Sequence, residues 1–143
     1  MQDYGQFKTL ALCPKTNNCV STAEEANDEN HFVPTWTYNP EDGRGRRKPA
    51  SKQQAMSELV EVVKNSKPDN FTPSIIKQTD DYLYVEYVSP TFGFVDDTEF
   101  YFQGDRCVAD TVAITLSLEM SRYKPSSLIL LCLCMHVLKH SPL

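Results

Sequence analysis

The chain has 143 residues, of which 41% are hydrophobic and 23% charged, and its formal net charge is −5 at pH 7. This length fits one domain, and the apolar content is enough for one core. The chain does not have the excess of basic residues that is typical of a nucleic-acid-binding protein, so we expect no nucleic-acid partner. These bounds leave the chemical activity open.

The N-terminal region holds a pair of cysteines in a turn-rich loop. Residues 1–12 contain no long apolar run and no cleavage-site pattern, so we expect no targeting peptide within the chain. Cys13 and Cys19 then enclose five residues that include a proline and two asparagines. They could form a disulfide, bind a metal or stay free, and the spacing predicts that their Cα atoms approach within the bridging range of about 4.4–6.8 Å. The chain has five cysteines, so at least one is unpaired if all bonds are intramolecular.

The next stretch has weaker patterns. Residues 21–25 are typical of a capped helical turn, and residues 31–38 alternate like a short edge strand. A basic run follows in a glycine-flanked loop, and it could contact phosphate or anionic lipid or simply be solvated. Its members are Arg44, Arg46, Arg47 and Lys48.

A helix is predicted from Ser51 to about Asn65. Ser51 suits the N-cap, and Gln54 stands where a capping box needs it. Pro68 prevents continuation of the helix. One face carries apolar residues at helical spacing, namely Ala55, Leu59, Val62 and Val63.

Residues 82–102 predict an antiparallel hairpin, and residues 71–78 predict a strand before it. Pro90 and Gly93 favour a chain reversal in the middle. The first hairpin strand alternates, with Leu83, Val85 and Tyr87 on one face and Tyr82, Tyr84 and Glu86 on the other.

The helix and the hairpin together predict the core. The apolar stripe of the helix needs the apolar face of a sheet to cover it. We therefore expect Leu59 and Val62 to be buried together with Val85 and Tyr87.

An acidic cluster lies in the second hairpin strand. Asp97 and Glu99 are two residues apart and share a face, with Asp96 on the other face. The cluster could hold Mg²⁺ or Ca²⁺, or serve in acid–base catalysis. Alternatively, the carboxylates pair with basic residues on a neighbouring strand, or they lie at a solvated edge.

The C-terminal part contains one alternating stretch and one apolar run. Residues 112–120 favour a further strand. The run at 128–135 is about half the length of roughly 20 residues that a membrane span needs, so we expect no transmembrane segment. It could make a peripheral membrane or protein contact.

Two motifs together resemble a known family. They are CPKTNNCVS at residues 13–21 and FGFVDDTEF at residues 92–100. In this order, with the helix between them, they are similar to the domain of unknown function 1499 over about residues 9–104. The plant members of that family are mostly plastid proteins. The sequence that flanks the two motifs resembles the plant form, so the resemblance implies a plastid location. It implies no settled activity.

The resemblance fades after residue 105. The family continues with a strand that ends in an arginine-bearing motif and with a closing helix, and residues 106–143 show neither. We interpret residues 1–105 as a family-like domain and residues 106–143 as an atypical segment, of the kind that an altered splice or a frameshift produces.

These patterns predict an α+β domain, in which an antiparallel sheet of about four strands is backed by one main helix. The leading functional hypothesis is a non-enzymatic binding or accessory module of the plastid, without a cofactor and with an unknown partner. The alternative is a metal-dependent enzyme that uses Asp96, Asp97 and Glu99.

Overall fold

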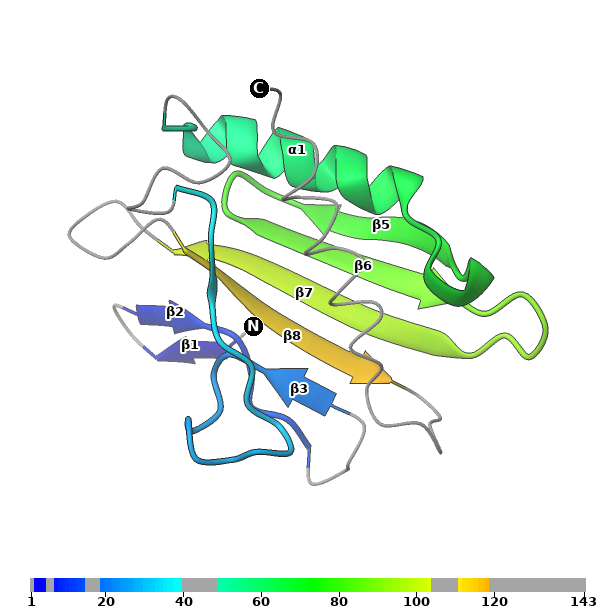
Figure 1. Cartoon of the computed structure of the whole chain (residues 1–143), viewed down its shortest axis with the longest axis horizontal. Helices are drawn as coiled ribbons and strands as arrows, with labels where there is room; N and C mark the ends of the chain where they lie inside the picture. The colour runs from blue at the N-terminus through cyan, green and yellow to red at the C-terminus, as the bar shows by residue number, and fades with distance from the viewer. Residues whose placement is uncertain (1, 5–6, 15–18, 40–48, 104–110, 119–143) are drawn as a thin grey trace.

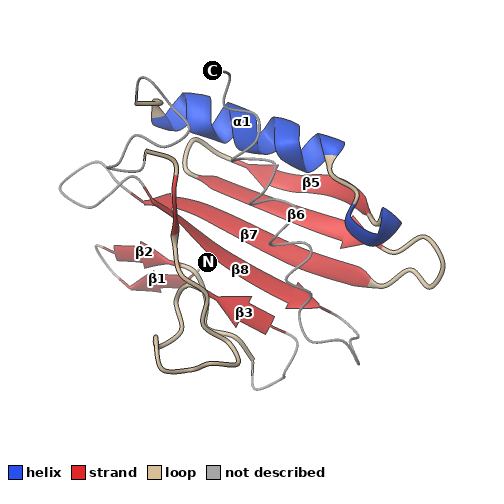
Figure 2. Cartoon of the chain, in the orientation of Figure 1, coloured by secondary structure: helices blue, strands red, loops and turns tan. Residues whose placement is uncertain are grey.

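In the described part of the chain, the fold is a six-stranded antiparallel sheet with one long helix, as seen in a computed structural model (Figures 1 and 2). The α+β class is therefore confirmed. A separate two-stranded hairpin lies near the N-terminus. The structure describes residues 2–4, 7–14, 19–39, 49–103 and 111–118.

The sheet has six strands, two of them very short. Its main path runs in the order β3 (Cys19–Ser21), β8 (Thr111–Leu118), β7 (Val95–Gln103), β6 (Tyr82–Val88) and β5 (Thr72–Gln78). The sixth strand, β4 (Trp36–Thr37), pairs with β8. The separate hairpin consists of β1 (Gln2–Tyr4) and β2 (Phe7–Thr9). The sheet exceeds the expected four strands because β8 pairs with both β3 and β4. Strand β3 is too short to show an alternating pattern, and β4 lies within the alternating residues 31–38.

The long helix α1 (Lys52–Asn65) begins where the sequence predicts. The Gln54 backbone N–H donates to Ser51 Oγ at 3.1 Å, which is the N-cap bond expected of a serine there. A short 3₁₀ helix (Pro68–Asn70) follows and leads into β5. Helix α1 runs along the β5 side of the sheet (Figure 1).

The main core lies between α1 and the sheet. Leu59, Val85 and Tyr87 are buried in one cluster, as expected, and Val62 packs half-buried at its edge. Strand β7 adds Phe100, whose ring lies 6.4 Å from that of Trp36 between centroids. The cluster is made of Ala55, Met56, Leu59, Val63, Leu83, Val85, Tyr87, Phe100 and Phe102.

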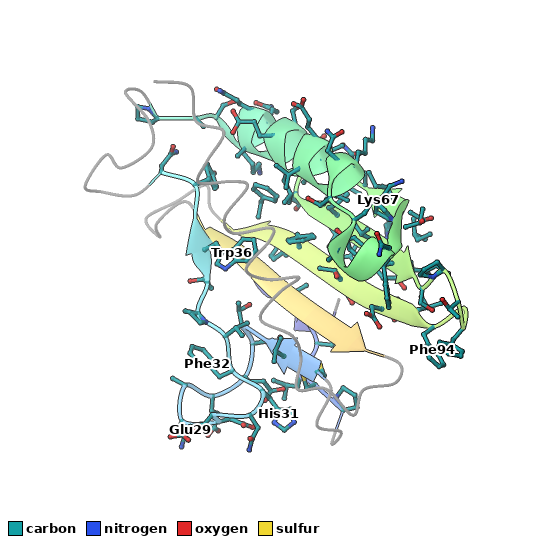
Figure 3. The ribbon with its side chains drawn as sticks, turned by 45° about the vertical axis from the view of Figure 1, so that its right-hand side comes forward. Glu29, His31, Phe32, Trp36, Lys67 and Phe94 are labelled. Atoms are coloured by element: carbon teal, nitrogen blue, oxygen red, sulfur yellow. A yellow bond between two sulfur atoms is a disulfide. The ribbon has the colours of Figure 1, made fainter. Side chains whose placement is uncertain are left out.

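The hairpin of β6 and β7 is regular. Its register runs from the pair Tyr82 and Tyr101 to the pair Val88 and Val95. The turn is closed by the Ser89 backbone N–H, which donates to the Phe94 carbonyl at 2.8 Å. Figure 3 shows Phe94 at the tip of this turn. Gly93 has a φ of 67°, a conformation that few residues other than glycine adopt, so the predicted reversal at Gly93 is confirmed.

Two local expectations need correction. Residues 31–38 form no continuous strand: Phe32 makes an isolated parallel bridge with Ser21 and only Trp36–Thr37 form β4, because Pro34 between them lacks a backbone N–H for a ladder. Residues 21–25 form no helical turn, because Ser21 belongs to β3 and pairs with Thr115 of β8. The Ser21 hydroxyl accepts from the Ala23 backbone N–H at 3.1 Å, as in a serine turn rather than a helix cap.

Candidate functional site

The face of the sheet that points away from α1 is polar. Alternation along β6 directs Leu83 and Val85 into the core, so their neighbours point to the opposite face. The β6–β7 register sets these neighbours beside acidic residues of β7. We call this surface the tyrosine–carboxylate face, and its members are Tyr82, Tyr84, Glu86, Asp97, Glu99 and Tyr101.

Tyrosine hydroxyls donate to the carboxylates across the two strands. The Tyr82 hydroxyl donates to Glu99 Oε2 at 2.8 Å, and the Tyr84 hydroxyl donates to Asp97 Oδ1 at 2.8 Å. The Tyr84 hydroxyl also lies 3.2 Å from Glu86 Oε1. A hydroxyl has one proton, so two carboxylates share a single donor at Tyr84. The pair Glu86 and Asp97 therefore keeps acceptor capacity for an outside cation or donor.

The hydroxyls of this face stay protonated near neutral pH. Burial raises the pKa of Tyr82, and its hydrogen bond to Glu99 raises this pKa further. Burial also raises the pKa of Tyr84, with a second contribution from the hydrogen bond to Asp97. The pKa of Tyr101 is raised by burial and by the charge of Asp81. Tyr82 and Tyr84 therefore act as hydrogen-bond donors to the carboxylates near neutral pH.

A backbone irregularity brings one cation to this face. The register of β5 shifts between Ile75 and Lys77, so that Lys77 and not Ile76 pairs with Tyr84. Such a bulge moves the following side chains to the other face of a strand. Lys77 Nζ consequently lies 5.7 Å from the centroid of the Tyr82 ring, which is a cation–π contact. Ile76, which the bulge displaces, is 52% exposed.

A short segment of the N-terminal region covers one end of the face. We call residues 10–13 the strap. Leu10 is 1% exposed and packs on Tyr82, with Tyr84 and Tyr101 beside it. A disulfide joins Cys13 to Cys19 of β3, and their Cα atoms lie 5.6 Å apart. The strap is therefore tied to the edge of the same sheet that it covers.

The structure separates the three predicted acidic residues. Asp97 and Glu99 lie on the tyrosine–carboxylate face, whereas Asp96 is 8% exposed and points to the α1 side. Within the described parts of the chain, no group of three or more His, Cys, Asp or Glu side chains is arranged to hold a metal ion. The three carboxylates consequently do not converge on one ligand.

Two of the carboxylates have partners that the sequence did not predict. Asp97 and Glu99 accept hydrogen bonds from tyrosines of β6. On their other side, the β8 register positions opposite them hold Ser117 and Thr115.

Several members of the site were not singled out from the sequence. Tyr82, Tyr84 and Glu86 were assigned to one face of the strand, and that alternation was the available signal for them. Leu10 and Lys77 gave no such signal, because a loop crossing and a bulge bring them to the face. The basic run Arg44, Arg46, Arg47 and Lys48 and the apolar run at 128–135 lie outside the described residues.

Comparison with known proteins identifies the family. The chain matches the family described as protein of unknown function (DUF1499) over residues 9–114, which is most of its length, and it belongs to that family. The match extends beyond the expected limit near residue 104 and includes the first residues of β8. No curated protein and no solved structure matches the chain. Among the described residues, no helix is both long and apolar enough to cross a bilayer.

Proposed function

We propose that this chain is a non-enzymatic binding module whose tyrosine–carboxylate face binds a cationic segment of a partner protein. The observation that carries the proposal is the contact of Lys77 with the Tyr82 ring, which supports it because an ammonium group of the chain itself already lies against this face. Beside it, Glu86 and Asp97 share one hydroxyl donor and can accept more hydrogen bonds. A lysine or arginine side chain supplies both the charge and the donors that such a surface lacks.

The chemistry of the face favours binding over catalysis. An acid or base that works near neutral pH needs a pKa near the operating pH. Burial and the carboxylates move the pKa of Tyr82 and Tyr84 upward, away from that range. Metal-dependent catalysis by Asp96, Asp97 and Glu99 would require them to reach one ion, and the sheet stands between Asp96 and the other two.

The family resemblance supports a plastid location for this activity. We therefore include in the proposal that the partner is a plastid protein with a basic segment. The net charge of −5 supports attraction of such a partner over a distance.

The proposal is tested with a fluorescein-labelled octalysine peptide and fluorescence anisotropy. The face variant is Glu86→Gln with Asp97→Asn, and its matched control is Glu25→Gln with Glu61→Gln, which removes the same charge from exposed positions elsewhere. We expect the face variant to bind roughly tenfold more weakly, since each lost ion pair is worth up to about 1 kcal/mol. The control should bind within about twofold of the parent chain.

Two outcomes would count against this proposal. Equal weakening in both double variants would mean that the peptide senses only net charge. A rise in melting temperature with Mg²⁺ or Ca²⁺ that Asp97→Asn abolishes would point to the metal-dependent alternative, because an ion that binds the folded state must stabilise it.

A further inference from the structure

We infer that the disulfide between Cys13 and Cys19 is a redox latch that holds the strap over one end of the tyrosine–carboxylate face. Reduction releases the strap and uncovers Tyr82, the hydroxyl of which donates to Glu99. The effect of this latch on partner binding rests on the proposed function, whereas the uncovering itself does not.

The strap covers a functional group and not merely a surface. Leu10 is 1% exposed and Tyr82 is 7% exposed, and the two side chains form a small buried cluster of their own. Ala23 packs at its edge. This cluster lies on the opposite side of the sheet from the main core, so the strap can leave without opening the packing around α1.

Few other bonds that the structure shows hold the strap. The Ser21 hydroxyl donates to the Ala11 carbonyl at 3.4 Å, which is a long hydrogen bond. The Cys13 backbone N–H donates to a carboxylate oxygen of Glu24. Both bonds are partly exposed, so water competes for them. The disulfide to β3 adds a covalent restraint to these two bonds and to the burial of Leu10 against Tyr82.

The two cysteine residues differ in exposure, which favours one direction of the exchange. Cys19 is 1% exposed and belongs to β3, where it pairs with Ser117 of β8. Cys13 is partly exposed and lies between exposed neighbours, Leu12 and Pro14. An incoming thiolate therefore reaches the sulfur of Cys13 and expels the thiolate of Cys19.

The exchange balances with a dithiol as the reductant. Its first thiolate forms a mixed disulfide with Cys13 as the bond between Cys13 and Cys19 breaks, and the Cys19 thiolate takes up a proton. The second thiol of the reductant, after losing its proton, attacks the mixed disulfide and leaves as a cyclic or protein disulfide. Cys13 takes up the second proton, so two electrons pass from the dithiol to the cysteine pair.

Nitration of tyrosine by tetranitromethane measures the uncovering directly. The full chain is compared in its oxidised form and after reduction with dithiothreitol, alkylation with iodoacetamide and removal of both reagents. Mass spectrometry with fragment-ion sequencing then assigns nitration to each tyrosine. We expect Tyr82 to be nitrated roughly fivefold faster in the reduced form, because it is released by local opening.

Tyr87 is the internal control, since it is 0% exposed and lies in the main core on the other face. Its nitration should stay unchanged. An equal rise in the nitration rate of Tyr87 would show that reduction unfolds the domain. An unchanged nitration rate at Tyr82 would show that the strap still covers this residue after reduction. Either result overturns the latch.

Two variants separate the parts of this inference. Cys13→Ser removes the link without alkylation and should reproduce the fast nitration of Tyr82. Leu10→Ala keeps the disulfide but removes most of the side chain that packs on Tyr82. It should therefore speed nitration of Tyr82 in the oxidised form as well. Leu10→Ala could speed nitration of Tyr82 while reduction and Cys13→Ser leave it unchanged. The strap would then cover Tyr82 without control by the disulfide, and the inference of a redox latch would be wrong.

The consequence for binding is measured with the same octalysine peptide. The reduced, alkylated chain should bind about threefold or more tightly than the oxidised chain, because the strap no longer covers one end of the tyrosine–carboxylate face. Fast nitration of Tyr82 without tighter binding would uphold the opening but count against the proposed function of the face. Tighter binding without faster nitration would overturn the latch and leave the face intact.

Discussion

The two faces of the sheet use the same strands but are held in different ways. On the α1 side, alternate residues of β6 and β7 join the helix in one apolar cluster. On the other side, the residues between them form tyrosine–carboxylate hydrogen bonds, and a disulfide-tethered strap adds one buried leucine. Burial of apolar area stabilises the first face, and the second face contributes polar groups that remain near water. The apolar core therefore lies on one face of the hairpin, and the polar groups on which the proposed binding rests lie on the other.

The broadest test of this comparison is removal of β8, which both faces need. Ending the chain after Asp105 deletes the strand that pairs with β7, β3 and β4. Strand β7 then gains a long unpaired edge, and the disulfide is left without its anchor in the sheet. We expect no cooperative urea transition by circular dichroism for residues 1–105.

A chain that ends after Leu118 is the matched control, because it keeps every described strand. We expect it to unfold cooperatively. If residues 1–105 unfold as cooperatively as the full chain, β8 is dispensable and residues 1–105 are the folding unit, as the sequence alone suggested.

The next test removes packing from the α1 side only. Leu59 is 5% exposed at the centre of the cluster, so Leu59→Ala should lower the free energy of unfolding by about 2–5 kcal/mol in urea titrations. Ile76→Ala is the control, since Ile76 is 52% exposed and its loss should cost less than about 0.5 kcal/mol. A Leu59→Ala cost below about 0.5 kcal/mol would contradict the packing of α1 on the sheet.

A smaller effect is expected when the tether on the other side is removed. Cys13→Ser should lower the free energy of unfolding by roughly 2 kcal/mol, as the chain-entropy estimate gives for a loop this short. Hydrogen exchange should show where the loss falls. Backbone amides of residues 10–13 and of β3 should exchange faster, while those of α1 should follow only the global change. Faster local exchange in α1 would contradict the independence of the two faces.

The α1 side of the sheet could be predicted from the sequence better than the other side, because it is built from local patterns. Helix α1 and the hairpin of β6 and β7 follow from local patterns, because the 3.6-residue and two-residue periods mark the apolar side of each element. The cap at Ser51 and the reversal at Gly93 are equally local.

The other face depends on contacts between distant residues. Leu10 reaches Tyr82 across 72 positions of sequence (82 − 10), and no local pattern signals that contact. A bulge brings Lys77 to the face, and a strict alternation would have sent it to the other side. Strand β3 is likewise defined by its pairing with β8, far along the chain. The acidic cluster was visible in sequence, but its tyrosine partners required the register between the two strands.

The smallest expected effect is a pH dependence that belongs to the tyrosine–carboxylate face. Burial and hydrogen bonds to the carboxylates raise the folded-state pKa of Tyr82 and Tyr84 above the unfolded value of about 10. Above that unfolded value the unfolded chain releases tyrosine protons that the folded chain retains, so the free energy of unfolding falls as pH rises. The contribution of these hydroxyls is therefore fully present at pH 7–9 and is lost progressively from about pH 10 upward.

Urea titrations at pH 8, 9, 10 and 11 should show this decline, and absorbance at 295 nm should show that tyrosine ionises late in the folded chain. The paired change Tyr82→Phe with Tyr84→Phe removes two of the ionisable groups, so its free energy of unfolding should fall less steeply above pH 10 than that of the parent chain. Tyr101→Phe is the matched single control, because the pKa of Tyr101 is also raised but its hydroxyl has no hydrogen bond to a carboxylate among the bonds that the structure shows. A steeper decline in the double variant would mean that Tyr82 and Tyr84 ionise more readily in the folded chain than in the unfolded one. That result would contradict their role as proton donors to Asp97 and Glu99, and with it the physical basis of the polar face.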